Sequence, residues 1–162
     1  MRVLYVNVYS LLYSPRYINS NESVLATYLS GRYRTPFDVM KSIPHDVLSA
    51  RLLEQAALSA GMLIYPVEPR GVRRFILDKN VFRFSSLAPD IDWTGKLRMG
   101  NDNHIARIRT HVELTGVKSW RSCGDLFYWE LKHQQHLHLK SPSDKGVTPE
   151  LLRRIRAIYQ EE

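Results

Sequence analysis

The first residues of the chain alternate in a way that predicts a β-strand. Leu4, Val6 and Val8 fall on one face of a strand over residues 3–9, and the opposite face is also largely apolar. Successive side chains of a strand point to opposite faces, so both faces of this strand should be buried. We therefore predict a central strand of a sheet.

Two helices are predicted next. The first covers residues 21–30, where apolar positions recur at helical spacing before Gly31. The second covers residues 44–60, with Pro44 in its first turn and Gly61 at its exit. Its apolar face, which we expect to be buried, comprises Leu48, Leu52, Leu53, Ala56, Ala57 and Ala60.

Three runs rich in β-branched and aromatic residues follow, at residues 62–67, 72–77 and 81–85. They are separated by residues 68–71 and 78–80, whose Pro, Gly, Asp and Asn are typical of turns. Short connections of this kind join antiparallel strands. The pattern predicts a three-strand meander with a hairpin at the first turn.

The rest of the chain is expected to be largely helical. We predict an irregular segment at residues 87–103, helices at 105–114 and 123–132, a linker at 139–147 and a docked helix from Thr148 onward. The fold class that results is α+β. A small antiparallel or mixed sheet, formed by the opening strand and the meander, is packed by helices and followed by a helical C-terminal third.

Composition indicates one ordinary globular domain spanning residues 1–162. Cys123 is the only cysteine, so the chain cannot form an internal disulfide, which favours a reducing compartment. No segment approaches the roughly 20 apolar residues that cross a bilayer. We therefore expect a cytoplasmic protein without a membrane partner.

The charge of the chain points to a polyanionic partner. The formal net charge is +7, and 16 of the 23 basic residues are arginine. Guanidinium groups match the geometry of phosphates and carboxylates. Two partner classes fit, nucleic acid and an acidic protein surface. A basic protein without such a partner has the same composition.

Two groups of basic residues are the candidate nucleic-acid contacts. One follows the predicted hairpin turn, where a projecting basic ribbon could follow a phosphate backbone. The other accompanies residues 105–120, which are similar to a helix-turn-helix with Gly116 in the turn. The candidates are Arg70, Arg73, Arg74, Arg107, Arg109, Lys118 and Arg121.

The candidate metal ligands are His133, His136 and His138. Imidazole suits zinc, nickel or copper, but no single regular conformation places all three rings on one face. Because no nearby acid or thiolate completes the set, we expect a polar helix end here and no metal or cofactor.

A further candidate for catalysis is formed by Asp90, Glu130 and Lys132. Their order resembles the PD-(D/E)xK nuclease pattern, in which two acids hold a divalent ion and a lysine supports the attacking water. The separation of the two acids is much longer than in that pattern. Common nucleotide-binding and protease motifs are absent from the sequence.

The sequence thus favours a non-enzymatic accessory or regulatory protein that binds nucleic acid through an arginine-rich surface. The alternative is a small inhibitor or adaptor that docks on an acidic face of a larger protein, with Trp93, Trp120 or Trp129 as anchors. A metal-dependent nuclease is the third hypothesis.

Overall fold

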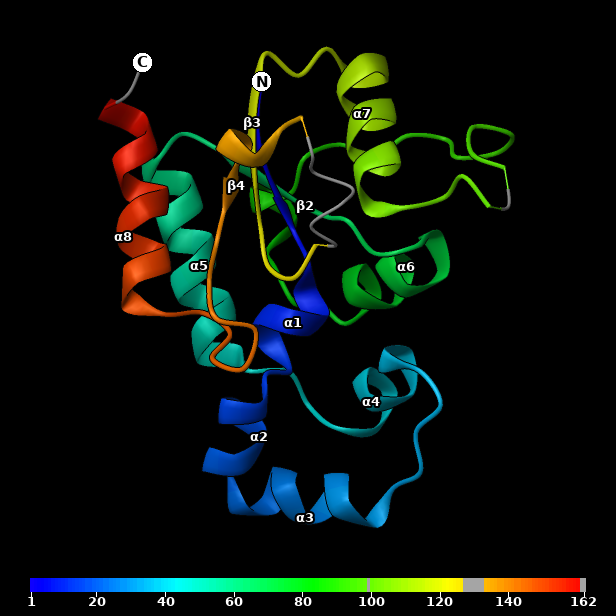
Figure 1. The fold of residues 1–162 in the computed structure, drawn as a ribbon, viewed down its shortest axis with the longest axis vertical. Helices are drawn as coiled ribbons and strands as arrows, with labels where there is room; N and C mark the ends of the chain where they lie inside the picture. Colours follow the sequence, from blue (N-terminus) through cyan, green and yellow to red (C-terminus); the bar gives the residue numbers. More distant parts are fainter. Residues whose placement is uncertain (99, 127–132, 161–162) are drawn as a thin grey trace.

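The protein is described by a computed structural model that covers residues 1–98, 100–126 and 133–160, with only the backbone of residue 160 (Figure 1). The strands in this part of the chain form one four-stranded sheet in the order β2-β1-β3-β4, and every neighbouring pair is parallel. The strands are β1 (Arg2–Val6), β2 (Leu63–Pro66), β3 (Ser119–Cys123) and β4 (His138–Leu139).

Strand β1 lies inside the sheet, which confirms the central position predicted from its two apolar faces. Leu4 and Val6 belong to one hydrophobic core, whereas Val3 and Tyr5 belong to a second core on the opposite face. The strand ends earlier than predicted. Val8 already begins a helix, because the Asn7 side chain accepts a hydrogen bond from the Ser10 N–H and caps it.

The two faces of the sheet are covered by different helices (Figure 1). Residues of α5 (Val47–Ser59) and α8 (Pro149–Ala157) pack in the core that contains Leu4, and residues of α7 (His104–Thr115) pack in the core that contains Tyr5. Strand β2 lies on one side of β1 in the sheet, and β3 lies on the other side, so the two connections cross the sheet in opposite directions. Right-handed crossovers place α5 and α7 on opposite faces in that case.

Four short helices between β1 and α5 form the end of the molecule that lies beyond the carboxyl ends of the strands (Figure 1). Each begins at a residue whose side chain accepts a backbone N–H of its first turn, which fixes where the helix starts. They are α1 (Val8–Leu12), α2 (Pro15–Ser20), α3 (Glu22–Ser30) and α4 (Pro36–Ser42), capped by Asn7, Ser14, Asn21 and Thr35.

The predicted antiparallel or mixed sheet is wrong, because the second and third strands of the meander do not form. Residues 72–77 lie in helix α6 (Arg70–Asp78), and residues 81–85 lead into the 3-10 helix η1 (Phe84–Ser86). Phe75 and Ile76 follow Val72 by three and four positions, so a helix places them on the same face as Val72. This spacing outweighs the β-propensity of the individual residues.

The predicted second helix of the helix-turn-helix is also wrong at its start. After Gly116, which ends α7 with a φ of 66°, the chain enters β3 and pairs with β1 from Arg2 to Val6. Cys123 closes this strand and is fully buried. Residues 127–132 of the predicted helix lie outside the described residues.

Helix α5 confirms the long helix predicted from the sequence but not its whole buried face. Leu53 and Ala56 are fully buried, whereas Leu48 is 69% exposed. In the C-terminal third, α8 packs against α5, and Ile155 and Ile158 are buried. Leu139, assigned to the linker, ends β4 instead.

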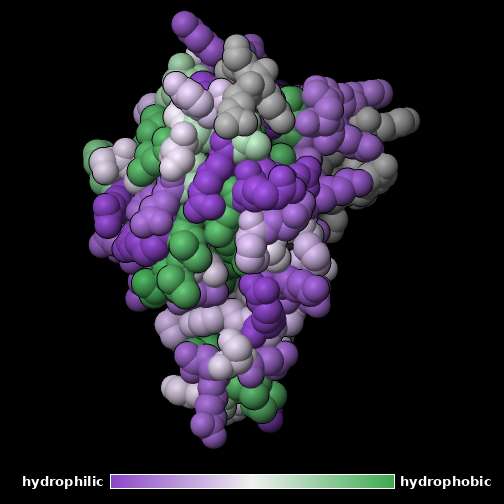
Figure 2. Space-filling view, turned by 90° about the vertical axis from the view of Figure 1, so that its left-hand side faces the viewer, coloured by the Kyte–Doolittle hydropathy of each residue, from purple (hydrophilic) through white to green (hydrophobic). Residues whose placement is uncertain are grey.

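None of the helices within the described ranges is both long and apolar enough to cross a membrane. Figure 2 views the molecule from the side of α8, where hydrophilic residues predominate and apolar residues show between them. The exposed arginines on α8 include Arg153 and Arg156.

Candidate functional site

A pocket of about 810 Å³ lies at the carboxyl ends of the strands. Its lining includes Asn7, directly after β1, Glu68, two residues after β2, and Asp125, two residues after β3. The strand order reverses between β1 and β3, and ligands of open parallel sheets bind in the crevice at such a point. Topology alone therefore marks this pocket as the candidate site.

Aromatic and aliphatic side chains from the surrounding helices form the pocket walls. Tyr9 of α1 and Tyr13, which caps the C-terminal end of α1, stack with ring centroids 6.1 Å apart, and both residues line the pocket. Burial raises the pKa of Tyr13 to about 12, so its hydroxyl stays protonated at neutral pH. The remaining large side chains of the walls are Ile18, Tyr28, Phe37, Met40 and Val72.

The turn after β3 is held against the turn after β1 by a compact hydrogen-bond network. The Asn7 side-chain amide donates to the carbonyl of Asp125, 2.6 Å away, and the Asp125 N–H donates to the Ser10 hydroxyl over 2.8 Å. Gly124 lies between them with a φ of 94°, and a Cβ there would come within 2.9 Å of the Asn7 Cβ. The crevice thus depends on glycine at this position.

Glu68 supplies a buried carboxyl group to the pocket. The residue lines the pocket, yet it is only 5% exposed. Its Oε1 accepts the Tyr9 N–H at 3.0 Å, while no described residue donates a well-formed hydrogen bond to Oε2. Burial raises the pKa of Glu68 to about 7, although backbone N–H groups and the charge of Arg107 favour ionisation.

Two buried arginines hold the loop that carries Glu68. Arg107 of α7 donates to the carbonyl of Val67 and pairs with Asp102, with 2.6 Å between its Nε and the carboxylate. Arg73 of α6 donates to the carbonyl of Glu68 over 3.4 Å and pairs with Asp90 at 3.0 Å. It also lies over the ring of Tyr65. These guanidinium groups therefore position the polar end of the pocket.

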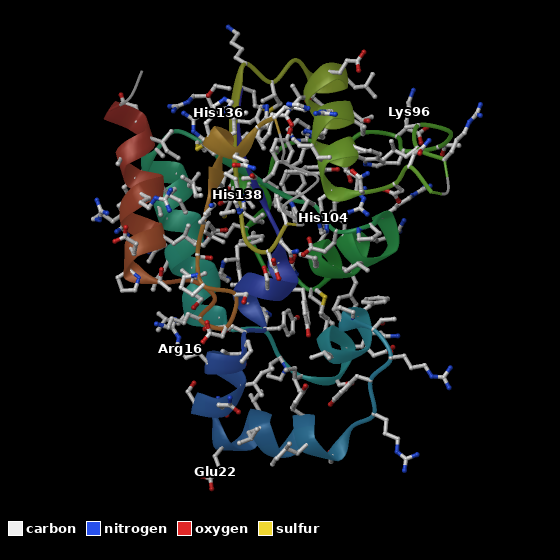
Figure 3. All side chains as sticks on the ribbon, in the orientation of Figure 1. Arg16, Glu22, Lys96, His104, His136 and His138 are labelled. Carbon is white, nitrogen blue, oxygen red and sulfur yellow. The ribbon has the colours of Figure 1, made fainter. Side chains whose placement is uncertain are left out.

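His104 also lines the pocket, from the first residue of α7 (Figure 3). Burial, followed by the positive charge of Arg107, lowers the pKa of His104 to about 4. The imidazole is therefore neutral at physiological pH, where it can both donate and accept a hydrogen bond.

Exposed basic residues stand beside the lining at four points of the chain. Arg16, Arg34, Lys41 and Arg70 each directly follow or precede a lining residue, and all four are exposed. We call these four residues the basic rim. Arg16, labelled in Figure 3, also donates to the carbonyl of Val147. The pocket therefore combines apolar walls and a buried carboxyl group, and four exposed basic residues are next to its lining residues in the sequence.

The structure distributes the predicted nucleic-acid contacts over several elements. Arg73 and Arg107 are buried and held in ion pairs, so their guanidinium groups face inward. Arg70 and Arg74 are exposed on a helix rather than on a hairpin tip. The others lie on or beside α7 and β3, where Arg109 and Lys118 are exposed and Arg121 is half-buried.

The nuclease candidates are not brought together by the described part of the chain. Asp90 accepts hydrogen bonds from the Tyr65 hydroxyl and the Trp93 indole and pairs with Arg73. These hydrogen bonds outweigh the effect of burial and lower the pKa of Asp90. Glu130 and Lys132 lie outside the described residues.

The candidate histidines have separate surroundings. His133 and His136 are exposed, and His138 is half-buried on β4, where its Nδ1 lies 2.9 Å from the Ser122 hydroxyl. Within the described ranges, no three His, Cys, Asp or Glu side chains are grouped so as to hold a metal ion.

Sequence reasoning missed Asn7, Glu68 and Asp125 as site residues. A signal was present for the first two, since each polar residue directly follows an apolar run that forms a parallel strand. The sequence pattern instead places Glu68 in a predicted hairpin turn. Only the strand order shows that the three positions share one edge.

The chain was compared with known protein families, with curated proteins and with solved structures. None of the three comparisons finds a match. The function must therefore be inferred from the chemistry of the pocket and its border.

Proposed function

We propose that this protein binds single-stranded nucleic acid, with one base in the pocket and the neighbouring phosphates over the basic rim. The observation that carries the proposal is the aromatic pocket at the switch point of the sheet, with the exposed residues Arg16, Arg34, Lys41 and Arg70 next to its lining residues in the sequence. Unpaired bases are bound in this way, by stacking on aromatic rings while cations hold the backbone. The proposal includes no catalytic step.

The size and the charge distribution support this ligand class. A volume of about 810 Å³ falls within the range of roughly 300–1,000 Å³ typical of ligand pockets. The net charge of +7 attracts a polyanion, whereas the walls offer an aromatic surface rather than further cations. In this proposal the base binds to the aromatic walls and the phosphates bind to the basic rim.

The inhibitor alternative depends on exposed tryptophan anchors. The Trp93 indole donates to Asp90 at 3.0 Å, and Trp120 packs edge-to-face on Tyr5 with centroids 5.8 Å apart. Both side chains are half-buried in internal contacts, and Trp129 lies outside the described residues. These contacts favour the nucleic-acid proposal over the inhibitor.

The proposal is tested by fluorescence anisotropy with labelled single-stranded oligonucleotides at several salt concentrations. A variant with Arg34, Lys41 and Arg70 changed to alanine should bind more weakly. Each lost phosphate contact should reduce the magnitude of the logarithmic salt slope by about 0.7, so three contacts amount to about 2.

A matched control removes the same charge elsewhere. Arg109, Lys118 and Arg156 are exposed and do not border the pocket, and their joint change to alanine should leave most of the slope intact. Equal losses in both variants would favour diffuse attraction, and a loss in the control alone would move the site to that surface. No binding by the folded wild-type protein would refute the proposal and favour an acidic protein partner.

A further inference from the structure

The buried carboxyl group of Glu68 has no role in the general nucleic-acid binding proposed above. Glu68 lines the pocket, and its Oε2 is buried and receives no well-formed hydrogen bond from a described residue, although the backbone N–H groups of Val8 and Glu68 also act on the carboxyl group. A buried acceptor without a partner costs free energy that a ligand donor can recover. Oε2 therefore indicates that the ligand carries an N–H or O–H group at this point.

The other carboxylate oxygen of Glu68, Oε1, can accept a further hydrogen bond. Oε1 accepts the Tyr9 N–H at 3.0 Å, and a carboxylate oxygen can accept more than one hydrogen bond. A ligand with two adjacent donors can therefore engage both oxygens. Such paired, charge-assisted hydrogen bonds are stronger and more selective than single neutral ones.

Resting on the function proposed above, we propose that Glu68 selects guanine. Guanine is the base whose Watson–Crick edge presents two adjacent donors, N1–H and the exocyclic amino group, to a carboxylate. In adenine and cytosine a ring nitrogen with a lone pair stands beside the amino group and would face the second carboxylate oxygen. Uracil and thymine place a carbonyl on either side of their single N–H.

The walls are suited to hold the base in that orientation. Tyr9 belongs to the same short segment that binds Glu68 Oε1 through its N–H, so its ring and the carboxyl group are fixed relative to one another. Phe37 and Tyr28 reach the pocket from α4 and α3. A planar base can therefore stack on the walls while its edge meets Glu68.

The test measures the affinities of the four ribonucleoside monophosphates and of short homopolymers by calorimetry at about pH 8.5, where the Glu68 carboxyl is ionised. A correct bidentate contact is worth about 1–3 kcal/mol, so GMP should bind at least about fivefold more tightly than the other three nucleotides. Inosine monophosphate keeps N1–H but lacks the amino group, and its affinity should fall between those of GMP and AMP.

Two variants separate the role of Glu68 from general effects of a buried carboxyl group. Glu68→Gln replaces one acceptor oxygen with a donor and should abolish the preference for GMP. Glu54→Gln changes another buried glutamate, which pairs with Arg51 and Arg83 away from the pocket, and should preserve it. Circular dichroism of both variants tests whether they are folded.

The outcomes distinguish the two proposals. If oligonucleotides bind but the wild type shows no preference among bases, or if Glu68→Gln keeps the preference for GMP, the guanine assignment is wrong while the general proposal stands. If homopolymers bind and monophosphates do not, the preference is read from poly-G against the other homopolymers. If neither class binds, both proposals fail.

Discussion

The guanidinium group of Arg107 donates a hydrogen bond to the backbone carbonyl of Val67, the residue that precedes Glu68. This hydrogen bond joins the first turn of α7 to the loop after β2. Helix α7 leads into β3, which lies on the other side of β1 from β2, so the bond links the chain segments on both sides of the central strand. Arg107, which the sequence places among the predicted nucleic-acid contacts, is buried and supports this loop from inside.

We predict that Arg107→Ala lowers the free energy of unfolding by about 1–3 kcal/mol, because the buried carbonyl of Val67 loses its donor. Arg109→Ala, two residues later on the same helix but exposed, should change it by no more than about 0.5 kcal/mol. Urea titration of both variants measures the difference. Equal midpoints would show that Arg107 does not stabilise the loop.

The close approach of Gly124 to Asn7 gives a second prediction. Gly124→Ala should destabilise the protein more than Gly95→Ala, because both residues have a positive φ but only the Cβ at position 124 meets other atoms within 4 Å. The melting temperatures of the two variants provide the comparison. A similar decrease in both would indicate that the crevice tolerates a side chain here.

The buried carboxyl group of Glu68 predicts a dependence of stability on pH. The pKa of Glu68 is raised by burial from 4.5 to about 7, so the folded state binds the proton more tightly than the unfolded chain. The resulting stabilisation is complete below about pH 4.5 and is lost as the pH rises through about 7. Relative to Glu68→Gln, which cannot titrate, the wild type should become less stable over this range.

Urea midpoints of the wild type and of Glu68→Gln, measured at intervals between about pH 5 and pH 9, test this expectation. Both proteins keep His104, so the histidine contributes equally to each curve. Parallel curves would show that the carboxyl group titrates as it does in the unfolded chain.

The register of α5 gives a prediction about the core. Leu53 is fully buried and Leu53→Ala should cost about 2–5 kcal/mol, whereas Leu48 is 69% exposed and Leu48→Ala should cost less than about 0.5 kcal/mol. Denaturation midpoints of the two variants are compared. A large effect at Leu48 would favour the buried face that the sequence pattern indicated.

Local patterns predicted several elements correctly for a physical reason. The alternation around Leu4 and Val6 and the long apolar spacing of α5 are both strong, and Gly61 and Gly116 follow helices as expected. The C-terminal helix α8 is capped by Thr148, whose hydroxyl accepts the Leu151 N–H. Capping and periodicity act over a few residues and are therefore visible in the sequence.

The direction of the sheet could not be obtained in the same way. Val72, Phe75 and Ile76 have high β-propensity but helical spacing. If these residues formed a strand, β2 would have an antiparallel neighbour; because they form a helix, the next strand of the sheet is β3, which is parallel to β1. Burial on both faces of β1 is also typical of parallel sheets and was the more informative signal. The pocket followed from the strand order and was therefore missed with it.

Amide-resolved NMR titration with a short single-stranded, guanine-containing oligonucleotide tests the location of the site most directly. We expect the largest chemical-shift changes at Tyr9, Glu68 and Asp125, which come from three strand ends but line one pocket. The amides of Arg109 and Lys118 should change little. Changes confined to those two residues and their neighbours, or no change at saturating oligonucleotide, would contradict a nucleic-acid site at the carboxyl edge of the sheet.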